Sequence, residues 1–401
     1  MNICNISYCK KCIQPSFLFF LIKKERKESI FFVISKKECT LAQNYKKDVN
    51  MTDYKYKVTI GMPVYGVEKY IRKCLLSVLN QTFQDEIEIL VVDDLGPDKS
   101  MDIVREIQAS HPKGGRIKIL TQAQNMGCWA ARNRILDEAQ GKYLLLVDSD
   151  DYLSGNAVEK MYETAEEYQA EAVYGSVESV DEEGNSANFS QGDMKLPFKV
   201  LIGKDELASY ANQNLHATLY NFIWNVLLRM DFLKKHQLKF HETRFADDIL
   251  FETDMQPLIE RAVLLPDDTY YYVLRPGSLS NFQLRKEIKL TEIEQYVKIY
   301  SYIKNQVRAL KDKPYYETRC AKVMIYMFYI ICGAIKNRSK ITPHLTDRTI
   351  KKAMTHPISF WEIVRFKKNK IANLGFWLIG ALPPVLSVFA LKLLGKQKHL
   401  L

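Results

Sequence analysis

Short apolar runs alternate with amphipathic segments over residues 57–180, and this alternation constrains the fold more than any other feature of the chain. Residues 87–92 and 143–147 are apolar along nearly their whole length rather than at every second position. Strands of this kind are typical of parallel sheets that helices cover on both faces. Their alternation with helical spacing is typical of βαβ units. We therefore predict an α/β, Rossmann-like fold with a mostly parallel sheet.

The expected elements fall in this regular order as far as residue 180, and less regularly after it. The expected strands are 58–63, 87–92, 117–120, 143–147, 172–180 and 270–274. The expected helices are 68–79, 101–109, 129–139, 157–170, 207–233 and 249–259.

Charge is distributed unevenly along the 401 residues, whose formal net charge is +10. Residues 1–50 carry ten Lys/Arg against four Asp/Glu, and residues 351–401 carry nine against one, which leaves residues 51–350 mildly acidic. A nucleic-acid-binding protein carries its basic surface on the folded body. We therefore expect no nucleic-acid partner, and we expect the basic ends to face an anionic membrane surface.

Three segments follow from these patterns. Residues 1–50 form a basic extension without a clear period, and we interpret Met51 as the native start; a genuine membrane-touching leader is the alternative. We expect one domain over residues 51–280 and a helical region over residues 281–401. The single Cys9-Lys-Lys-Cys12 has no partner pair, so we expect reduced cytosolic thiols rather than a zinc site.

Two uncharged runs in the last third bear on the membrane. Residues 374–391 contain Pro383-Pro384 and lie between basic residues, so we interpret them as an interfacial or re-entrant anchor rather than a span. A buried C-terminal hairpin is the alternative. Residues 323–335 are too short for a span, and we expect a buried core helix there.

The chemistry is expected outside the carboxyl ends of the strands, where ligands of open parallel sheets bind. Asp93 and Asp94 follow one strand, and Asp148, Asp150 and Asp151 follow another. Clustered carboxylates repel one another unless a cation neutralises them. Their oxygens suit Mg²⁺ or Mn²⁺, with diphosphate oxygens completing the shell.

The chain has no glycine cradle for phosphate. No Gly-x-Gly-x-x-Gly occurs, and Gly61-Met-Pro-Val-Tyr-Gly66 continues with Val67 instead of the Lys-Ser/Thr of a P-loop. A metal on acidic residues therefore has to hold the phosphates, which favours an enzyme that handles a nucleoside diphosphate through Asp-x-Asp.

With these motifs, the chain resembles family 2 glycosyltransferases, which have the GT-A fold, and in particular those of bacterial polysaccharide biosynthesis. The resemblance extends from about residue 57 to 281. The matching stretches are residues 60–65, 91–94, 125–127, 131–133, 147–151, 246–251 and 272–278.

The resemblance implies a role for each matching residue on the donor side. It assigns to the nucleotide-sugar donor Pro63, Tyr65, Glu68, Asp93, Asp94, Arg132, Asp148, Arg275 and Ser278. Arg132 lies near the diphosphate in this assignment, and Arg275 and Ser278 belong to a segment that closes over the donor. Asp148 and Asp150 hold the ribose and a Mn²⁺ or Mg²⁺ ion, with Asp150 the first choice for direct ligand.

The resemblance also implies the chemistry. Asp248 takes the position of the catalytic base, so that the acceptor oxygen displaces the nucleoside diphosphate with inversion. Asp247, which stands where the family usually has Glu, and Trp224 belong to the acceptor side. From its own position alone, Asp248 is better explained as an ordinary acid at a helix N-terminus, and the aspartates after the strands together with the matching Phe251 are what favour the base. Trp224 is equally a core residue.

The implied enzyme is a hexosyl- or N-acetylhexosaminyltransferase that uses a UDP-sugar and a saccharide or lipid-linked acceptor. We expect it in the cytoplasm, peripheral at the inner membrane face. Two other interpretations remain: a sugar-nucleotide pyrophosphorylase, and a membrane-associated scaffold with an inactive glycosyltransferase domain.

Overall fold

A computed structural model describes residues 17–22, 30–35, 54–83, 85–187, 195–215, 222–275 and 286–401. The chain divides into two compact units, residues 1–53 and 54–401. In the first, β1 (Phe17–Ile22) pairs antiparallel with β2 (Ile30–Ser35). The proposed start at Met51 and the proposed boundary near 280 lie outside the described residues.

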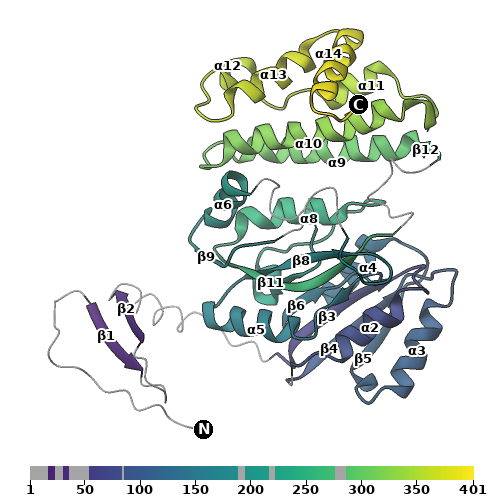
Figure 1. Cartoon of the computed structure of the whole chain (residues 1–401), viewed down its shortest axis with the longest axis vertical. Helices are drawn as coiled ribbons and strands as arrows, with labels where there is room; N and C mark the ends of the chain where they lie inside the picture. The colour runs from purple at the N-terminus through teal and green to yellow at the C-terminus, as the bar shows by residue number, and fades with distance from the viewer. Residues whose placement is uncertain are drawn as a thin grey trace. The chain divides into compact units, whose positions relative to one another are not determined.

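A nine-stranded sheet forms the body of the second unit, in the order β5-β4-β3-β6-β10-β8-β11-β7 with β9 on β11 (Figure 1). Its strands are β3 (Tyr56–Val64), β4 (Ile87–Asp93), β5 (Ile117–Thr121), β6 (Gly141–Leu146), β7 (Tyr152–Leu153), β8 (Ala172–Val180), β9 (Lys199–Ile202), β10 (Val226–Arg229) and β11 (Arg261–Val273). Four helices join the first strands: α2 (Ile71–Leu79), α3 (Ser100–Ser110), α4 (Cys128–Glu138) and α5 (Ala157–Tyr168).

The half of the sheet formed by β5, β4, β3 and β6 is parallel throughout, as the sequence predicts. Every residue of β4 is buried, which is what apolar runs on both faces require. Parallel strands end at the same edge, so the polar residues that follow β3, β4 and β6 are brought together there.

The other half is mixed, and the predicted helix over 207–233 is wrong. The structure has α6 (Glu206–Asn214), then β10, then α7 (Met230–Lys235). Strand β10 lies antiparallel between β6 and β8, with Leu227 opposite Leu145 and Val173. A short apolar run has the same appearance in a buried helix and in a buried strand. Residues 226–229 form a strand because they pair with β6 and β8, and both of these strands are distant in sequence.

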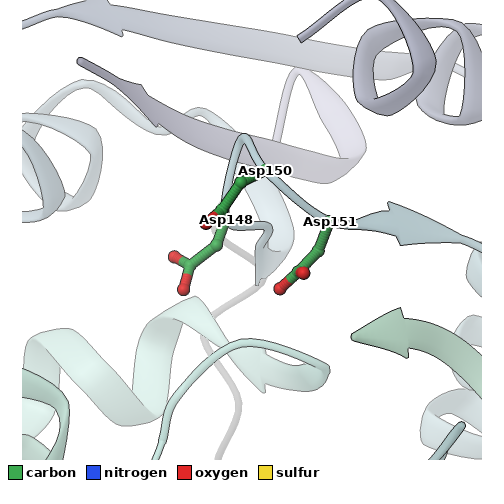
Figure 2. A group of neighbouring side chains, drawn as sticks. All are labelled: Asp148, Asp150 and Asp151. Carbon is green, nitrogen blue, oxygen red and sulfur yellow. The ribbon is translucent and has the colours of Figure 1, made fainter. Parts of the chain in front are cut away.

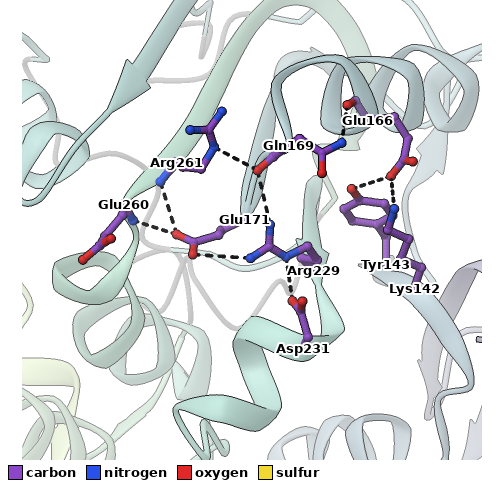
Figure 3. A network of polar contacts seen from close by, with 9 residues as sticks. All are labelled: Lys142, Tyr143, Glu166, Gln169, Glu171, Arg229, Asp231, Glu260 and Arg261. Carbon is purple, nitrogen blue, oxygen red and sulfur yellow. Dashed lines mark hydrogen bonds and ion pairs between the residues drawn. The ribbon is translucent and has the colours of Figure 1, made fainter. Parts of the chain in front are cut away.

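A polar network fixes the strand ends on the edge away from the acidic cluster (Figure 3). The Glu171 carboxylate accepts hydrogen bonds from the backbone N–H groups of Glu260 and Arg261 and lies 3.5 Å from the Arg229 guanidinium. These contacts join the starts of β8 and β11 to the end of β10. They hold the antiparallel insertion in register.

The C-terminal helices have a hydrophobic core of their own, which Leu250 of α8 (Asp247–Met255) joins. The helices are α9 (Leu290–Ala309), α10 (Tyr316–Lys336), α11 (Asp347–Ala353), α12 (Phe360–Ile363), α13 (Lys370–Ala381) and α14 (Pro384–Gln397). Shorter elements are β12 (Ile288–Lys289), β13 (Ile341–Thr342), η1 (Gly114–Arg116), η2 (Gln256–Leu258) and η4 (Arg338–Lys340).

One helix of the described residues, α10, is long and apolar enough to cross a membrane, and 67% of its apolar window is buried inside the protein. This burial fits the core helix expected over 323–335. The uncharged run 374–391 forms neither one long helix nor a fully buried one. It bends before Pro384 into two helices, α13 and α14, each with one buried side.

Candidate active site

The acidic cluster lies where the parallel half of the sheet ends. Asp148, Asp150 and Asp151, which we call the strand-end acids, follow β6 in a single turn, and their carboxylates point to the same side of it (Figure 2). One oxygen of each lies within 4.8 Å of an oxygen of the others. Three carboxylates at this spacing need a compensating positive charge.

The strand-end acids differ in their hydrogen-bond and ion-pair partners. Both oxygens of Asp151 have partners within the protein: Oδ1 accepts from the Val273 N–H (2.8 Å), and Oδ2 accepts from the Tyr270 hydroxyl (2.9 Å). Asp148 Oδ1 is bound by Arg132 at 2.8 Å, and Asp150 Oδ2 forms an ion pair with Arg275. The other oxygens, Asp148 Oδ2 and Asp150 Oδ1, lie outside these ion pairs.

Electrostatics favour a cation at this cluster of carboxylates. Burial, followed by the charges of Asp150 and Asp148, raises the pKa of Asp151 well above its ordinary value. Burial, followed by the charge of Asp148, also raises the pKa of Asp150. A divalent cation relieves this repulsion, and carboxylate oxygens are what Mg²⁺ and Mn²⁺ prefer. The residues therefore fit a metal held by Asp148 and Asp150, with Asp151 shaping the turn.

Arg132 links the strand-end acids to the next acidic group. Its side chain is buried, and Nη2 donates to Asp148 Oδ1 while Nη1 donates to Asp247 Oδ2 at 2.9 Å. Its Nε is buried without a hydrogen-bond partner among the described residues. The resemblance implies that Arg132 lies near the diphosphate; the structure places its guanidinium between two aspartates, on α4.

Asp247 and Asp248, which we call the α8 acids, occupy the first turn of α8. Ala246 before them has φ = 58°, a left-handed conformation that turns the chain into the helix. Asp248 Oδ1 accepts from the Ile249 N–H at 2.9 Å. Burial raises the pKa of Asp248 to about 7; the charges of Asp247 and Asp148 add to the increase, and Arg132 opposes it. A carboxylate with this pKa is suited to general-base catalysis near neutral pH.

The two acids after β4 have structural partners. Asp94 is buried, and its carboxylate accepts from the N–H groups of Met126 (2.8 Å) and Gly127 (2.9 Å), which positions the start of α4. Asp93 is also buried; Oδ1 accepts from the Leu95 N–H, and Oδ2 lies 4.0 Å from Arg105. Their donor-binding role stays a prediction, and the structure shows that both oxygens of Asp94 bind the loop before α4.

The loop after β3 is the most open part of the site. Tyr65 and Glu68 are exposed and Pro63 is partly buried. The Glu68 carboxylate accepts from the Lys99 N–H, which ties this loop to the one after β4. A side chain at Gly96 would meet the Gly66 nitrogen at 2.6 Å, so the two loops touch only because Gly96 has no Cβ.

Arg275 reaches the site from the end of β11. Its guanidinium pairs with Asp150 and lies over the Tyr70 ring, 5.3 Å from the ring centroid. Ser278, assigned to the same segment, lies outside the described residues.

Trp224 and Asp247, the two residues expected on the acceptor side, are both buried. Trp224 is 5% exposed and stacks on Phe222 and Tyr270, so the core alternative describes it better. Asp247 is buried, and its carboxylate orients Arg132. A sugar has little access to either side chain.

Comparison with known proteins decides the family. Residues 59–226 match the model described as glycosyl transferase family 2. Glycosyltransferase GlyA of Streptococcus pneumoniae serotype 4 is 34% identical over 241 residues, which is 57% of this chain and 32% of that protein. The poly(ribitol-phosphate) beta-glucosyltransferase of Bacillus spizizenii is 33% identical over 222 residues, 55% of this chain and 32% of that protein. The chain thus spans about a third of these two relatives.

The fold has a counterpart among solved structures. S. aureus TarS 1-349, crystallised in complex with UDP-GlcNAc, superposes with a TM-score of 0.60 at 19% identity, over 81% of this chain and 90% of that one. Residues 59–226 therefore form a family 2 glycosyltransferase domain. Its fold is GT-A. The family match favours a glycosyltransferase over the sugar-nucleotide pyrophosphorylase.

Sequence reasoning placed Asp151 in the acidic cluster without giving it a role of its own, and it missed Tyr270. Tyr270 donates to Asp151 and accepts from the Asp148 N–H at 3.2 Å, so one hydroxyl holds the turn of the strand-end acids. Asp151 had a signal, because it adjoins the Asp-x-Asp pair. Tyr270 had none, since it lies more than a hundred residues away and meets the turn only through the sheet.

Proposed function

We propose that this family 2 glycosyltransferase is an inverting, metal-dependent enzyme that moves a sugar from a UDP-sugar to a hydroxyl of a saccharide or lipid-linked saccharide in surface polysaccharide synthesis. The observation that carries the proposal is the Arg132 bridge. It places the strand-end acids, suited to a metal and a diphosphate, beside Asp248, an acid whose pKa is raised to about 7. A donor site and a base candidate are thereby joined by one side chain.

The proposed reaction is a single displacement. The Asp248 carboxylate takes the proton of the acceptor hydroxyl as that oxygen bonds to the anomeric carbon of the sugar. The bond from this carbon to the diphosphate oxygen breaks, and its electron pair stays on the nucleoside diphosphate. A bound Mn²⁺ or Mg²⁺ supplies positive charge that stabilises this leaving group. Attack from the face opposite to the leaving group inverts the anomeric configuration.

The chain's own residues prepare this step. Asp148 and Asp150 would hold the metal, and Asp151 with Tyr270 keeps their turn in place. Arg132 lies between the Asp148 and Asp247 carboxylates and offsets their repulsion. Burial raises the pKa of Asp248, the neighbour of Asp247, to about 7. Arg275, which pairs with Asp150 at the edge of this cluster, carries a guanidinium that would suit a phosphate of the donor.

The substrate class and location are supported less directly. A relative named for adding glucose to poly(ribitol-phosphate) supports a polymeric acceptor, and the UDP-GlcNAc complex of TarS makes UDP the first nucleotide to test. The described cysteines Cys74, Cys128, Cys320 and Cys332 are free thiols, which fits a cytoplasmic enzyme. We place it peripherally at the cytoplasmic face of the membrane.

The test is the thermal stability of the full chain with UDP, GDP, CMP or TDP, each with and without Mn²⁺. A ligand at about 100 times its dissociation constant stabilises the folded state by about 2.7 kcal/mol. We expect a shift with UDP that requires Mn²⁺. The Asp150→Asn variant should lose it, whereas Asp137→Asn, at an exposed ion pair with Lys239, should keep it.

No shift with any nucleotide, from a folded sample, would favour the inactive-scaffold interpretation. A shift that Asp150→Asn retains would remove Asp150 from the metal site.

A further inference from the structure

The last three helices present large apolar side chains to solvent. We call these residues the α12–α14 face: Trp361, Ile371, Leu378, Val385, Leu386, Phe389 and Leu393. Trp361 is 73% exposed, Ile371 88% and Phe389 59%. Single exposed apolar residues are ordinary in soluble proteins, but several within one run of 33 residues (361–393) mark an interaction surface.

Helical spacing explains how this face coexists with a packed core. In α13, Ile371 and Leu378 are seven residues apart and share one side, while Phe376 is buried. In α14, Leu386, Phe389 and Leu393 are spaced by three and four residues, while Val388 and Leu391 are buried. Each helix therefore carries two apolar sides, one against the protein and one facing outward. Figure 1 shows these helices on the far side of α9 and α10 from the sheet.

Basic residues accompany the α12–α14 face. Residues 363–401 contain no Asp or Glu, and their seven Lys and Arg residues are Arg365, Lys367, Lys368, Lys370, Lys392, Lys396 and Lys398. Lys392 and Lys396 are exposed within α14 itself. The face is thus apolar with basic residues beside it. Such a face complements a partner that has an apolar interior and a negatively charged boundary.

We propose that the α12–α14 face docks on an anionic lipid bilayer, with its apolar side chains among the acyl chains and its lysines at the headgroups. This inference deepens the peripheral location proposed above. Charge argues against two other occupants: a second copy would bring the same basic residues together, and residues 1–50 are themselves net positive. A bilayer with anionic headgroups complements the charge.

The geometry of α13 and α14 fits two helices that lie on the membrane and do not cross it. Helices α13 and α14 have 12 and 14 residues, and Leu382 and Pro383 separate them. A span needs about 20 consecutive helical residues. The binding should therefore be reversible and should weaken as salt screens the lysines.

Vesicle co-sedimentation of the full chain tests the proposal, with phosphatidylcholine alone and with phosphatidylcholine plus phosphatidylglycerol. We expect binding to the anionic vesicles that high salt weakens. The double variant Phe389→Asp/Leu393→Asp should bind at least about tenfold more weakly. Lys392→Gln and Lys396→Gln should each cost about fivefold. Phe198→Asp removes an aromatic that is 54% exposed outside this face, and it should bind like the wild type.

Tryptophan fluorescence gives a second signal. Trp361 should shift to shorter wavelength on anionic vesicles, and Trp361→Phe should remove most of that shift. The result that overturns the proposal is a folded wild type that binds no anionic vesicles, or a double variant that binds them equally well. Self-association that the double variant abolishes, without vesicle binding, would assign the face to a second copy instead.

These measurements contain no donor and no acceptor. The docking proposal and the glycosyltransferase proposal can therefore fail separately: the nucleotide-dependent thermal shift reports on the site, and sedimentation reports on the α12–α14 face.

Discussion

Asp148, Asp150 and Asp151 at the end of β6, and Asp247 and Asp248 at the start of α8, are two acidic groups that share one arginine. The strand-end acids keep two oxygens outside their ion pairs, and their mutual repulsion is relieved by a cation. In the α8 acids, Arg132 neutralises Asp247 and leaves Asp248 with a raised pKa. In the proposed mechanism these identical side chains have different tasks: one group would hold a metal ion, and the other would take a proton.

Replacing Asp248 should give the largest effect on activity. Asp248→Asn removes the proton acceptor but keeps the size of the side chain, so kcat should fall by about 10² to 10⁴. Release of nucleoside diphosphate in the presence of acceptor measures this. Asp254→Asn, in the same helix, is the matched control and should keep most of the activity.

Replacing Arg132 should give the largest effect on stability. Arg132→Met leaves two carboxylates without their partner, and removing one side of a buried ion pair costs about 3–5 kcal/mol. Urea unfolding measures the loss. The double variant Arg132→Met/Asp247→Asn should recover part of it, because one of the two orphaned charges is gone; no recovery would mean that the bridge does not hold the two groups together.

Activity should rise with pH as Asp248 ionises. Its pKa is raised from 3.8 to about 7, so kcat/KM should increase through about pH 7 and level off above it. The contribution of Asp248 to the free energy of unfolding should instead fall as the pH rises. The folded chain keeps a proton on Asp248 that the unfolded chain loses near pH 4, so this group's contribution declines between about pH 4 and pH 7. In Asp248→Asn, the residual activity should lose the rise and the stability should lose this decline.

The smallest effect is expected at the contact between α8 and α9. The Tyr302 hydroxyl donates to Asp254 at 2.9 Å, and Asp254 also pairs with His241 in the loop before the α8 acids. Tyr302→Phe should lower the free energy of unfolding by about 1 kcal/mol and change kcat little. Tyr329→Phe, at an exposed position on α10, is the control. A large loss of kcat in Tyr302→Phe would show that the helical region positions Asp248.

The part of the site that follows the parallel strands could be predicted from the sequence. The rest could not, because it depends on contacts between residues that are far apart along the chain. Strands β3, β4 and β6 and the acids after them follow from local periodicity and from the rule that parallel strands end at one edge. Strand β10, the packing of Trp224 and the hydroxyl of Tyr270 depend on partners far along the chain. The Arg132 bridge is of the same kind, because Asp148 and Asp247 are 99 residues apart and only the fold makes them neighbours.

Calorimetric titration of UDP-sugar with Mn²⁺, on Asp150→Asn and Asp248→Asn side by side, tests most directly this division of work between the two acidic groups. Asp248→Asn should bind the donor as the wild type does while lacking turnover, and Asp150→Asn should lose metal-dependent binding. The opposite pattern, in which Asp150→Asn binds normally and Asp248→Asn does not, would contradict it.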